Sequence, residues 1–206
     1  MSESVFKEDL FKGKRVFVGP PRGGASPVAI QSIKLNSGLV NKKDYKEIRM
    51  PWNAGIQAMA DGKLDAFVRP AGIGAASMDQ LGAKRKFRLL EVNRKAMAKF
   101  MNIPDRVYMK IPAGTYKNQS NNDKDVLVDG FRHQLAVRKD MSDDLVYKIT
   151  KTLFDNLPAM KKTAITLRDI SLEDPFTGGN IPLHPGAIRF YKEVGKLWQW
   201  TDRLNW

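Results

Sequence analysis

The chain has 206 residues, no cysteine and two histidines, which excludes disulfide bonds, thiol catalysis and cysteine-based zinc sites. Its hydrophobic fraction of 42% and charged fraction of 28% are those of a folded protein with one large domain or two small lobes. The formal charge of +13 suits an anionic partner, but the 35 lysines and arginines are spread through every segment, so the charge is a weak guide to function.

The most informative stretch runs from Gly13 to Ser26. Residues 14–18 have the β-branched and aromatic character of a strand, the Gly-Pro-Pro that follows cannot continue one, and Pro27 suits the first turn of a helix. Such a loop directs the N–H groups and the positive dipole end of the helix at a bound anion, and Gly23 and Gly24 allow close backbone approach. The alternative is that these glycines only turn the chain. The spacing matches no nucleotide-binding loop, so a nucleotide is disfavoured.

Strands and helices alternate through the first half of the chain. In chain order, the patterns predict a helix over 28–35, a strand over 46–50, a helix over 54–60, a strand over 64–68, a helix over 78–83, a strand over 87–92 and a basic helix over 95–101. This alternation is typical of a parallel α/β sheet.

The second half of the chain is less regular. The patterns predict a turn-rich element at 111–116, a polar loop at 117–124, a strand over 126–137, a helix from Leu145 to about Asn156 and a helix over 187–200. Gly130 interrupts the long strand, which indicates a bend or a crossing between two lobes.

Ligands of open α/β sheets lie beyond the C-terminal ends of the strands, so the loops at 19–26, 51–54 and 69–74 are expected to converge on one crevice. Arg69 directly follows a strand, and a guanidinium can bind a carboxylate through two hydrogen bonds. The alternatives are a surface ion pair for Arg69 and a core position for Trp52. The predicted ligand-binding residues are Gly23, Gly24, Ala25, Ser26, Trp52, Asn53, Arg69, Gly72 and Ile73. We expect no catalytic residue, no metal site and no cofactor.

Seven segments, found in the same order, carry a resemblance to a known family. They are Leu10–Val16, Val18–Pro21, Asp61–Phe67, Ala71–Ile73, Ile111–Tyr116, Asp144–Lys151 and Ile181–Tyr191. Together they resemble the TAXI family of solute receptors, which are periplasmic subunits of the sodium-coupled TRAP transporters. Each segment alone is weak, but their shared order makes the resemblance specific.

The resemblance implies an α/β fold of the type II periplasmic-binding-protein kind, with one complete lobe and the C-terminal helices of a partial second lobe. The corresponding segments are a lead-in at 1–13, a ligand-binding lobe at 14–125, a hinge-crossing strand at 126–138 and the helical part of the other lobe at 139–206. The implied function is capture of a small organic anion, such as glutamate or a dicarboxylate, for uptake through TRAP membrane subunits. The alternatives are a truncated or non-transport binding protein of this fold, or an enzyme acting on small carboxylates; nucleic acid is not expected as a partner.

The chain departs from the family in two respects. The family usually has hydroxyl residues where this chain has Gly23 and Ala25, which leaves Ser26 and the backbone for contact with a carboxylate. The family's export signal and most of its first lobe lie upstream of the match, so we expect a periplasmic protein whose signal peptide and first lobe are missing here. Without that lobe, apolar side chains of the C-terminal helices should be unusually exposed, namely Leu153, Phe154, Tyr191 and Trp198.

Overall fold

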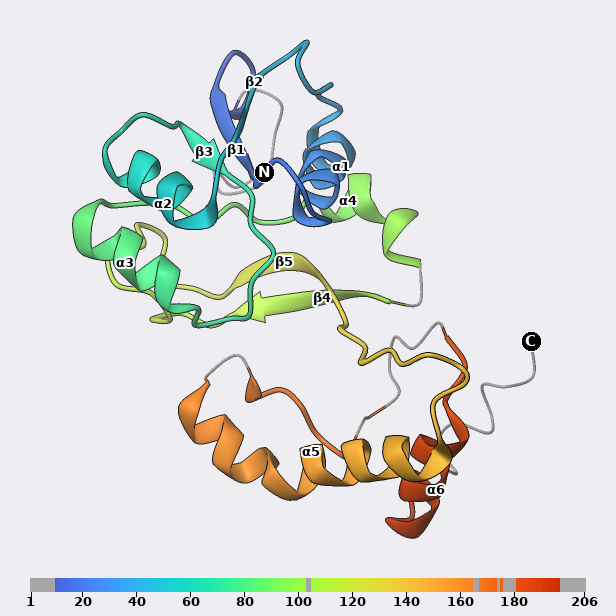
Figure 1. The fold of residues 1–206 in the computed structure, drawn as a ribbon. Coiled ribbons are helices and arrows are strands. Elements are labelled where there is room, and N and C mark those ends of the chain that lie inside the picture. Colours follow the sequence, from blue (N-terminus) through green and yellow to red (C-terminus); the bar gives the residue numbers. More distant parts are fainter. Residues whose placement is uncertain (1–9, 103–104, 165–166, 174, 176–180, 197–206) are drawn as a thin grey trace. The chain divides into compact units, whose positions relative to one another are not determined.

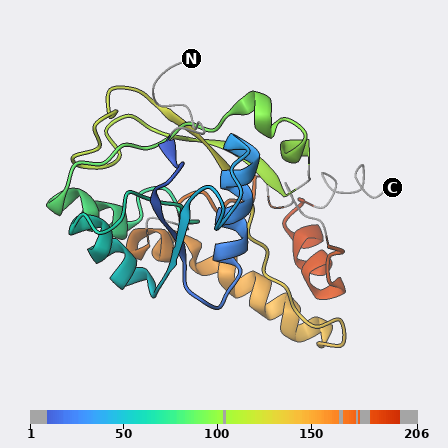
Figure 2. The ribbon, with the colours of Figure 1, turned by 90° about the horizontal axis from the view of Figure 1, so that it is seen from above.

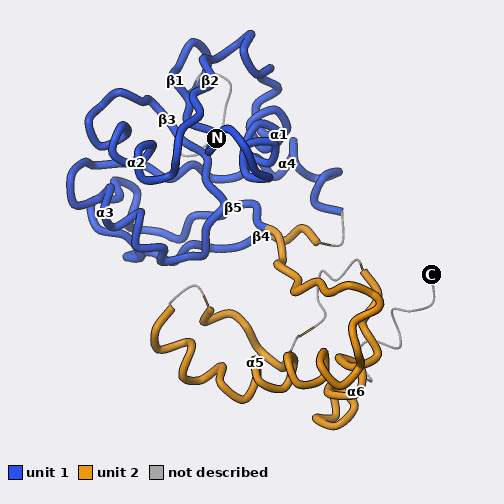
Figure 3. The backbone as a smooth tube through the Cα atoms, in the orientation of Figure 1, with its two compact units in different colours: residues 1–102, 108–130 blue, residues 103–107, 131–206 orange. Residues whose placement is uncertain are grey.

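A computed structural model of the chain describes residues 10–102, 105–164, 167–173, 175 and 181–196 (Figure 1). The chain forms two compact units, unit 1 with residues 1–102 and 108–130 and unit 2 with residues 103–107 and 131–206 (Figure 3). The elements are β1 (Arg15–Gly19), α1 (Ala25–Ser37), β2 (Lys46–Arg49), α2 (Trp52–Ala60), β3 (Ala66–Phe67), α3 (Ala76–Lys84), α4 (Arg94–Met97), the 3₁₀ helix η2 (Phe100–Asn102), β4 (Arg106–Ile111), β5 (Val126–Phe131), α5 (Asp143–Thr163) and α6 (Pro185–Glu193).

Unit 1 contains a parallel three-stranded sheet in the order β2-β1-β3. The register places Val16 opposite Glu47 on one side and opposite Ala66 on the other. β1 is buried from Val16 to Gly19, as its central place requires. The mixed α/β fold with parallel strands, predicted from the alternating pattern, is confirmed in this unit.

The two faces of β1 are covered by different helices (Figure 1, Figure 2). Val16 and Val18 pack with Ala29 and Ile33 of α1 in one apolar cluster. The side chain of Phe17 points to the opposite face, because successive side chains of a strand alternate. There it meets α2 at Gly55, where a Cβ atom would lie 2.1 Å from the Phe17 ring. The missing side chain of Gly55 therefore lets α2 approach β1 closely.

A second apolar cluster joins α2 and α3 to the second sheet, which consists of β4 and β5. Its buried members are Ile56, Met78, Leu81, Phe87, Ile111, Tyr116 and Val126. The hydroxyl of Tyr116 accepts a hydrogen bond of 2.9 Å from the backbone N–H of Gly74. This contact anchors the segment between β3 and α3 on the cluster.

The strand predicted over 87–92 is wrong. Phe87 forms only an isolated bridge to Gln119. The backbone of Leu89 is bound by a side chain instead of a neighbouring strand: its N–H donates to Oδ1 of Asn121 at 3.2 Å, and Nδ2 of Asn121 donates to its carbonyl at 3.0 Å. One amide side chain thus satisfies both polar groups that a ladder would have used.

Several element bounds also differ from the predicted ones. β4 was not predicted, β5 ends at Phe131 instead of 137, and α4 with η2 replaces the helix over 95–101. α2 begins at Trp52, two residues early. α5 continues through the exposed Pro158 to Thr163, losing one hydrogen bond to the Phe154 carbonyl. α6 ends at Glu193, and residues 197–200 of the predicted helix lie outside the described residues.

An aromatic cluster joins α5 and α6 in unit 2. The rings of Phe154 and Phe190 stack with centroids 5.5 Å apart, and Tyr191 packs edge-on against Phe154 at 6.0 Å. Tyr191 is only 8% exposed, so its expected exposure is wrong, because α5 itself supplies the covering side chains. Leu153 and Phe154 are half-buried, and Trp198 lies outside the described residues.

The first turn of α6 lies directly against the first turn of α5. A Cβ atom on Gly186 would lie 2.2 Å from the carbonyl oxygen of Asp143 and 2.8 Å from the backbone nitrogen of Tyr147. Real Cβ contacts are never this short, so the two backbones approach each other only because residue 186 has no side chain.

Arg15 and Asp65 connect the start of β1 to the segment before β3. The backbone N–H and the Nε of Arg15 donate to Oδ2 of Asp65 at 2.7 and 3.0 Å, and Nη2 donates to Oδ1 at 2.9 Å. These hydrogen bonds lower the pKa of Asp65 to about 2. The folded-state pKa is thus below the unfolded value of ~3.9, so the pair stabilises the fold above pH ~4 and loses this contribution as the pH falls towards 2.

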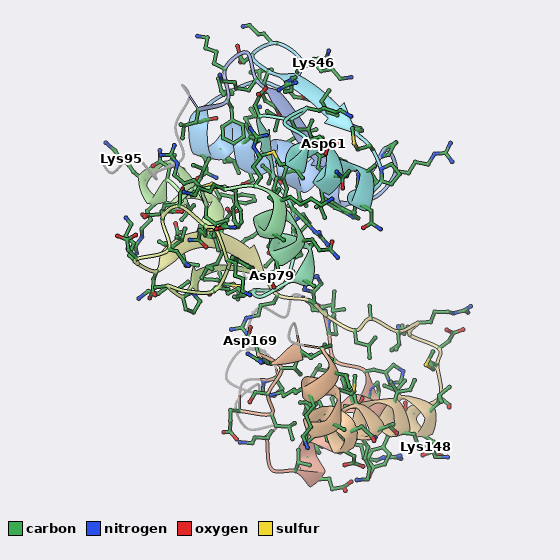
Figure 4. The ribbon with its side chains drawn as sticks, turned by 90° about the vertical axis from the view of Figure 1, so that its left-hand side faces the viewer. Lys46, Asp61, Asp79, Lys95, Lys148 and Asp169 are labelled. Carbon is green, nitrogen blue, oxygen red and sulfur yellow. The ribbon has the colours of Figure 1, made fainter. Side chains whose placement is uncertain are left out.

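In Asp65→Asn the free energy of unfolding should therefore fall less between pH 4 and pH ~2 than it does in the wild type. The effect on the free energy of unfolding at pH 7 should be modest, since both side chains are partly exposed and screened by water. Urea denaturation at pH 7, 4 and 3 measures this, with Asp79→Asn at an exposed position on α3 as the control (Figure 4). Equal pH profiles for the wild type and Asp65→Asn would contradict the assignment.

Candidate functional site

The three loops predicted to form the site follow β1, β2 and β3. Because these strands pair in parallel, their C-terminal ends lie at the same edge of the sheet. The first loop connects β1 to α1, the second is the short connection from β2 to α2, and the third leads from β3 to α3. The fold therefore brings the three loops to one side of unit 1.

The ring of Trp52 is the centre of this side. It packs edge-on against Phe17, with ring centroids 5.4 Å apart, and the guanidinium carbon of Arg69 lies 4.9 Å from its centroid. A Cβ atom on Gly19 would lie 3.3 Å from both the Trp52 ring and the Oγ of Ser26. Each of the three loops thus contributes at least one residue to the surroundings of the Trp52 ring. We call the group of Gly19, Ser26, Trp52 and Arg69 the Arg69 site.

Arg69 provides the positive charge of this site. Its Nε and Nη1 are buried and have no hydrogen-bond partner among the described residues. Burial lowers the pKa of Arg69 from its ordinary value, but a guanidinium stays charged at neutral pH. The alternative of a surface ion pair is not found in the described part of the chain. A half-buried cation without an anion is unfavourable, so a bound anion would relieve this cost.

The N-terminus of α1 adds a second positive element. Gly24 occupies the N-cap position, and within the described residues no side chain caps this terminus and no acidic residue lies in the first turn. The partial positive charge of the helix end is therefore not neutralised locally. Ser26 is fully buried, and its hydroxyl donates to the carbonyl of Pro20 at 2.8 Å. Its hydroxyl hydrogen therefore holds the loop in shape and is not available to a ligand.

The two glycines of the loop, Gly23 and Gly24, are exposed, and a Cβ atom on either would meet nothing within 4 Å. The protein's own packing does not require them to be glycine. Gly23 has a φ of +132°, a conformation that favours glycine, so the turn itself is a reason for this residue. A role in close approach to a ligand stays a prediction. Ala25 is half-buried as the first residue of α1.

The remaining predicted site residues belong to the second and third loops. Asn53 is exposed as the second residue of α2, and Gly72 is exposed in the third loop. Ile73 packs against the second apolar cluster, so its side chain stabilises the core. Neither Asn53 nor Gly72 is joined to the Arg69 site by an interaction among the described residues, and their part in ligand binding stays a prediction.

Sequence reasoning missed two residues that shape the site. Phe17 packs edge-on against the Trp52 ring. Tyr116 holds the third loop by accepting a hydrogen bond from the backbone N–H of Gly74. The alternation of side chains along β1 could have assigned Phe17 to the same face as α2. Tyr116 comes from a distant turn, and only its place in one of the seven resembling segments marked it.

The surface of unit 1 also has a hollow away from the Arg69 site. It lies beside β2 and is lined by Gly13, Lys42, Lys43, Asp44, Tyr45, Lys46, Glu47 and Arg49. Asp44 accepts from the backbone N–H of Val40, and Glu47 accepts from Asn41 and Arg49. Both carboxylates thus accept hydrogen bonds within the protein, and three of the other lining residues, Lys42, Lys43 and Lys46, are lysines.

The fold and the site define the class of protein. A parallel α/β unit whose loops surround an unpaired cation suits a receptor that binds an anionic solute, and the comparison with known families agrees. The model of the NMT1-like family matches residues 6–195. The chain belongs to this family, which is of the periplasmic-binding type and indicates a solute-binding receptor kind of function. The predicted class of periplasmic-binding-type solute receptor is thus supported, and membership of the TAXI family stays a prediction. None of the described helices has the length and apolar character needed to cross a bilayer.

Proposed function

We propose that the chain is a TAXI-type receptor that captures a small organic anion, such as glutamate or a dicarboxylate, in the periplasm and passes it to TRAP membrane subunits for sodium-coupled uptake. Membership of a periplasmic-binding-type family supports the receptor role. The single observation that carries the choice of an anion is the pair of buried guanidinium nitrogens of Arg69 that have no partner among the described residues.

A carboxylate complements this arrangement in charge and geometry. Its oxygens accept hydrogen bonds from guanidinium N–H groups, and such charge-assisted bonds are about twice as strong as neutral ones. The free end of α1 adds a favourable field. Nε and Nη1 of Arg69 are buried. The ligand therefore binds either at Nη2, or after the guanidinium rotates over the Trp52 ring and exposes Nε and Nη1. Trp52 then serves as the wall against which the guanidinium is positioned.

Binding without chemical conversion is part of the proposal. The three loops contain no Asp, Glu, His or Cys, so they offer no general base and no activated nucleophile. Among the described residues there is also no group of three His, Cys, Asp or Glu side chains that could hold a metal ion. The residues of the site are suited to holding an anion by hydrogen bonds and charge.

Arg69→Ala is expected to weaken carboxylate binding by about 1.5–3 kcal/mol, which is roughly tenfold to a hundredfold in Kd. Isothermal titration calorimetry with a set of small mono- and dicarboxylates, including glutamate and succinate, measures this. Arg69→Lys should lie between the wild type and Arg69→Ala, since it keeps the charge but loses the planar fork.

Arg88→Ala is the matched control, because Arg88 is an exposed arginine of the same unit outside the three loops. It removes the same charge and should leave the affinity unchanged. If Arg69→Ala binds as tightly as the wild type, Arg69 is not part of the site. If no small carboxylate binds to the wild-type chain, the proposed receptor function is wrong.

A further inference from the structure

The hollow beside β2 is separate from the Arg69 site. It begins at the N-terminal ends of the strands, because Gly13 precedes β1 and residues 42–45 precede β2, whereas the three loops follow the C-terminal ends. The rest of its lining runs along β2 itself, from Lys46 to Arg49. Its volume of about 650 Å³ is in the range of sites that bind a small molecule.

Positive charge dominates this hollow, since four of its lining residues are basic and two are acidic. Lys42, Lys43 and Lys46 are exposed, and among the described residues no hydrogen bond or ion pair engages their ammonium groups. These three groups are therefore available to an anion from solution.

The two acidic residues of the hollow are occupied by other partners. Oδ2 of Asp44 accepts a hydrogen bond of 2.7 Å from the backbone N–H of Val40. The side chain of Glu47 is 5% exposed, accepts a hydrogen bond of 2.6 Å from Asn41 and forms an ion pair with Arg49. Because that pair is neutral as a whole, the remaining charges of the hollow are the three lysines and Asp44.

Tyr45 adds a hydrogen-bond donor to the lining. Its ring is buried in the apolar cluster of Val16 and Ile33, and its hydroxyl has no hydrogen-bond partner among the described residues. Burial and the charge of Glu47 raise the pKa of Tyr45 to about 12, so the hydroxyl keeps its proton at neutral pH. Tyr45 therefore brings no negative charge to the hollow.

From this arrangement we infer that the hollow beside β2 is an anion site that binds the phosphate group of a phosphate ester. Ammonium groups are compact charges on flexible stems, so three of them can gather around the tetrahedral oxygens. A phosphate monoester carries a charge of about −1.5 to −2 at pH 7, so each ammonium group attracts it up to about twice as strongly as a monocarboxylate. The planar fork of Arg49, which would suit a carboxylate, is held by Glu47.

Calorimetry with glycerol 3-phosphate tests this inference on the full chain, at pH 7.5 in a buffer without phosphate. The triple variant Lys42→Gln, Lys43→Gln, Lys46→Gln should bind at least about tenfold more weakly than the wild type, because it loses all three charged donors. Arg69→Ala should keep the affinity of the wild type, because the inference does not depend on the Arg69 site.

The matched control is the triple variant Lys86→Gln, Lys95→Gln, Lys117→Gln, at exposed lysines of the same unit outside the hollow (Lys95 in Figure 4). It removes the same charge and should leave the affinity nearly unchanged. An equal loss in both triple variants would mean that only the net charge of the chain attracts phosphate, which overturns the inference. A loss in Arg69→Ala alone would place the phosphate at the Arg69 site and would overturn it as well.

A second measurement separates the two sources of a phosphate monoester, which are a soluble ester and a lipid headgroup. Phosphatidylcholine vesicles with and without phosphatidic acid are sedimented with the wild type and both triple variants. If only vesicles with phosphatidic acid bind, and only through the lysines of the hollow, the ligand is a headgroup; binding of glycerol 3-phosphate alone identifies a soluble ester. If neither binds, the hollow is not a phosphate site, and the proposed carboxylate receptor is unaffected.

Discussion

Replacing Phe17 by alanine is expected to lower the free energy of unfolding of unit 1 by about 3–5 kcal/mol. Phe17 is 0% exposed and fills the space between β1 and α2 that Gly55 leaves open. Its removal loses the buried ring and leaves a cavity between two rigid backbones. Urea denaturation followed by circular dichroism measures the loss, and Val40→Ala, at a side chain that is 44% exposed, is the control.

A double-mutant cycle with Gly55 tests whether the ring itself causes this effect. Gly55→Ala alone places a methyl group on the Phe17 ring and should destabilise the fold by about 1–3 kcal/mol, although alanine is the better helix former. In the Phe17→Ala background the methyl group has room, so the same change should cost little or should stabilise. Additive effects would contradict the packing described here. Loss of Phe17 should also weaken carboxylate binding, because Trp52 loses its support.

Gly186→Ala should have the largest effect on unit 2, with a loss of about 3 kcal/mol in its stability, the upper end of the usual range for overpacking. The new methyl group would overlap the carbonyl oxygen of Asp143 and approach the nitrogen of Tyr147, and backbone atoms of α5 cannot move aside as a flexible side chain can. α6 would have to shift, which would disturb the stack of Phe154 on Phe190. Hydrogen exchange of the α5 and α6 amides measures the loss.

Gly24→Ala is the control for this change. Its φ is ordinary for any residue, at −72°, and a Cβ atom there would meet nothing within 4 Å. The substitution removes a glycine at a helix start as Gly186→Ala does, but it introduces no overlap and should leave stability nearly unchanged. Unaltered exchange rates in Gly186→Ala would mean that α5 and α6 do not approach each other as described.

The regular part of unit 1 could be predicted from the sequence because its signals are local. The β-branched run of β1 and the breaks around it identify the strand, and the parallel α/β pattern follows from alternation. The strand over 87–92 could not be excluded in this way, since the backbone of Leu89 in its middle is bound by the side chain of Asn121, which is distant in sequence. The helix break expected after Asn156 also failed, because an exposed proline costs α5 only one hydrogen bond.

The candidate site shows the same division between local and distant signals. The position of Arg69 after a strand predicted that it would join the loop side of the sheet, and it does lie over Trp52. The lack of a partner for its nitrogens could not be predicted, because it depends on which side chains the fold brings near. Likewise Ile73 has a loop position in sequence but packs in the core once Tyr116 holds the adjacent Gly74.

The lysines around the hollow beside β2 affect how copies of the chain meet in solution. β2 lies at an edge of the described sheet, and the backbone groups of an edge strand can pair with the same strand of a second molecule. Lys46 is exposed along it, and Lys42 and Lys43 precede it, so two such edges would bring like charges together (Figure 4). This repulsion acts over a Debye length of about 10 Å at 0.1 M salt and about 3 Å at 1 M. Self-association through β2 is therefore suppressed in dilute buffer and favoured by concentrated salt.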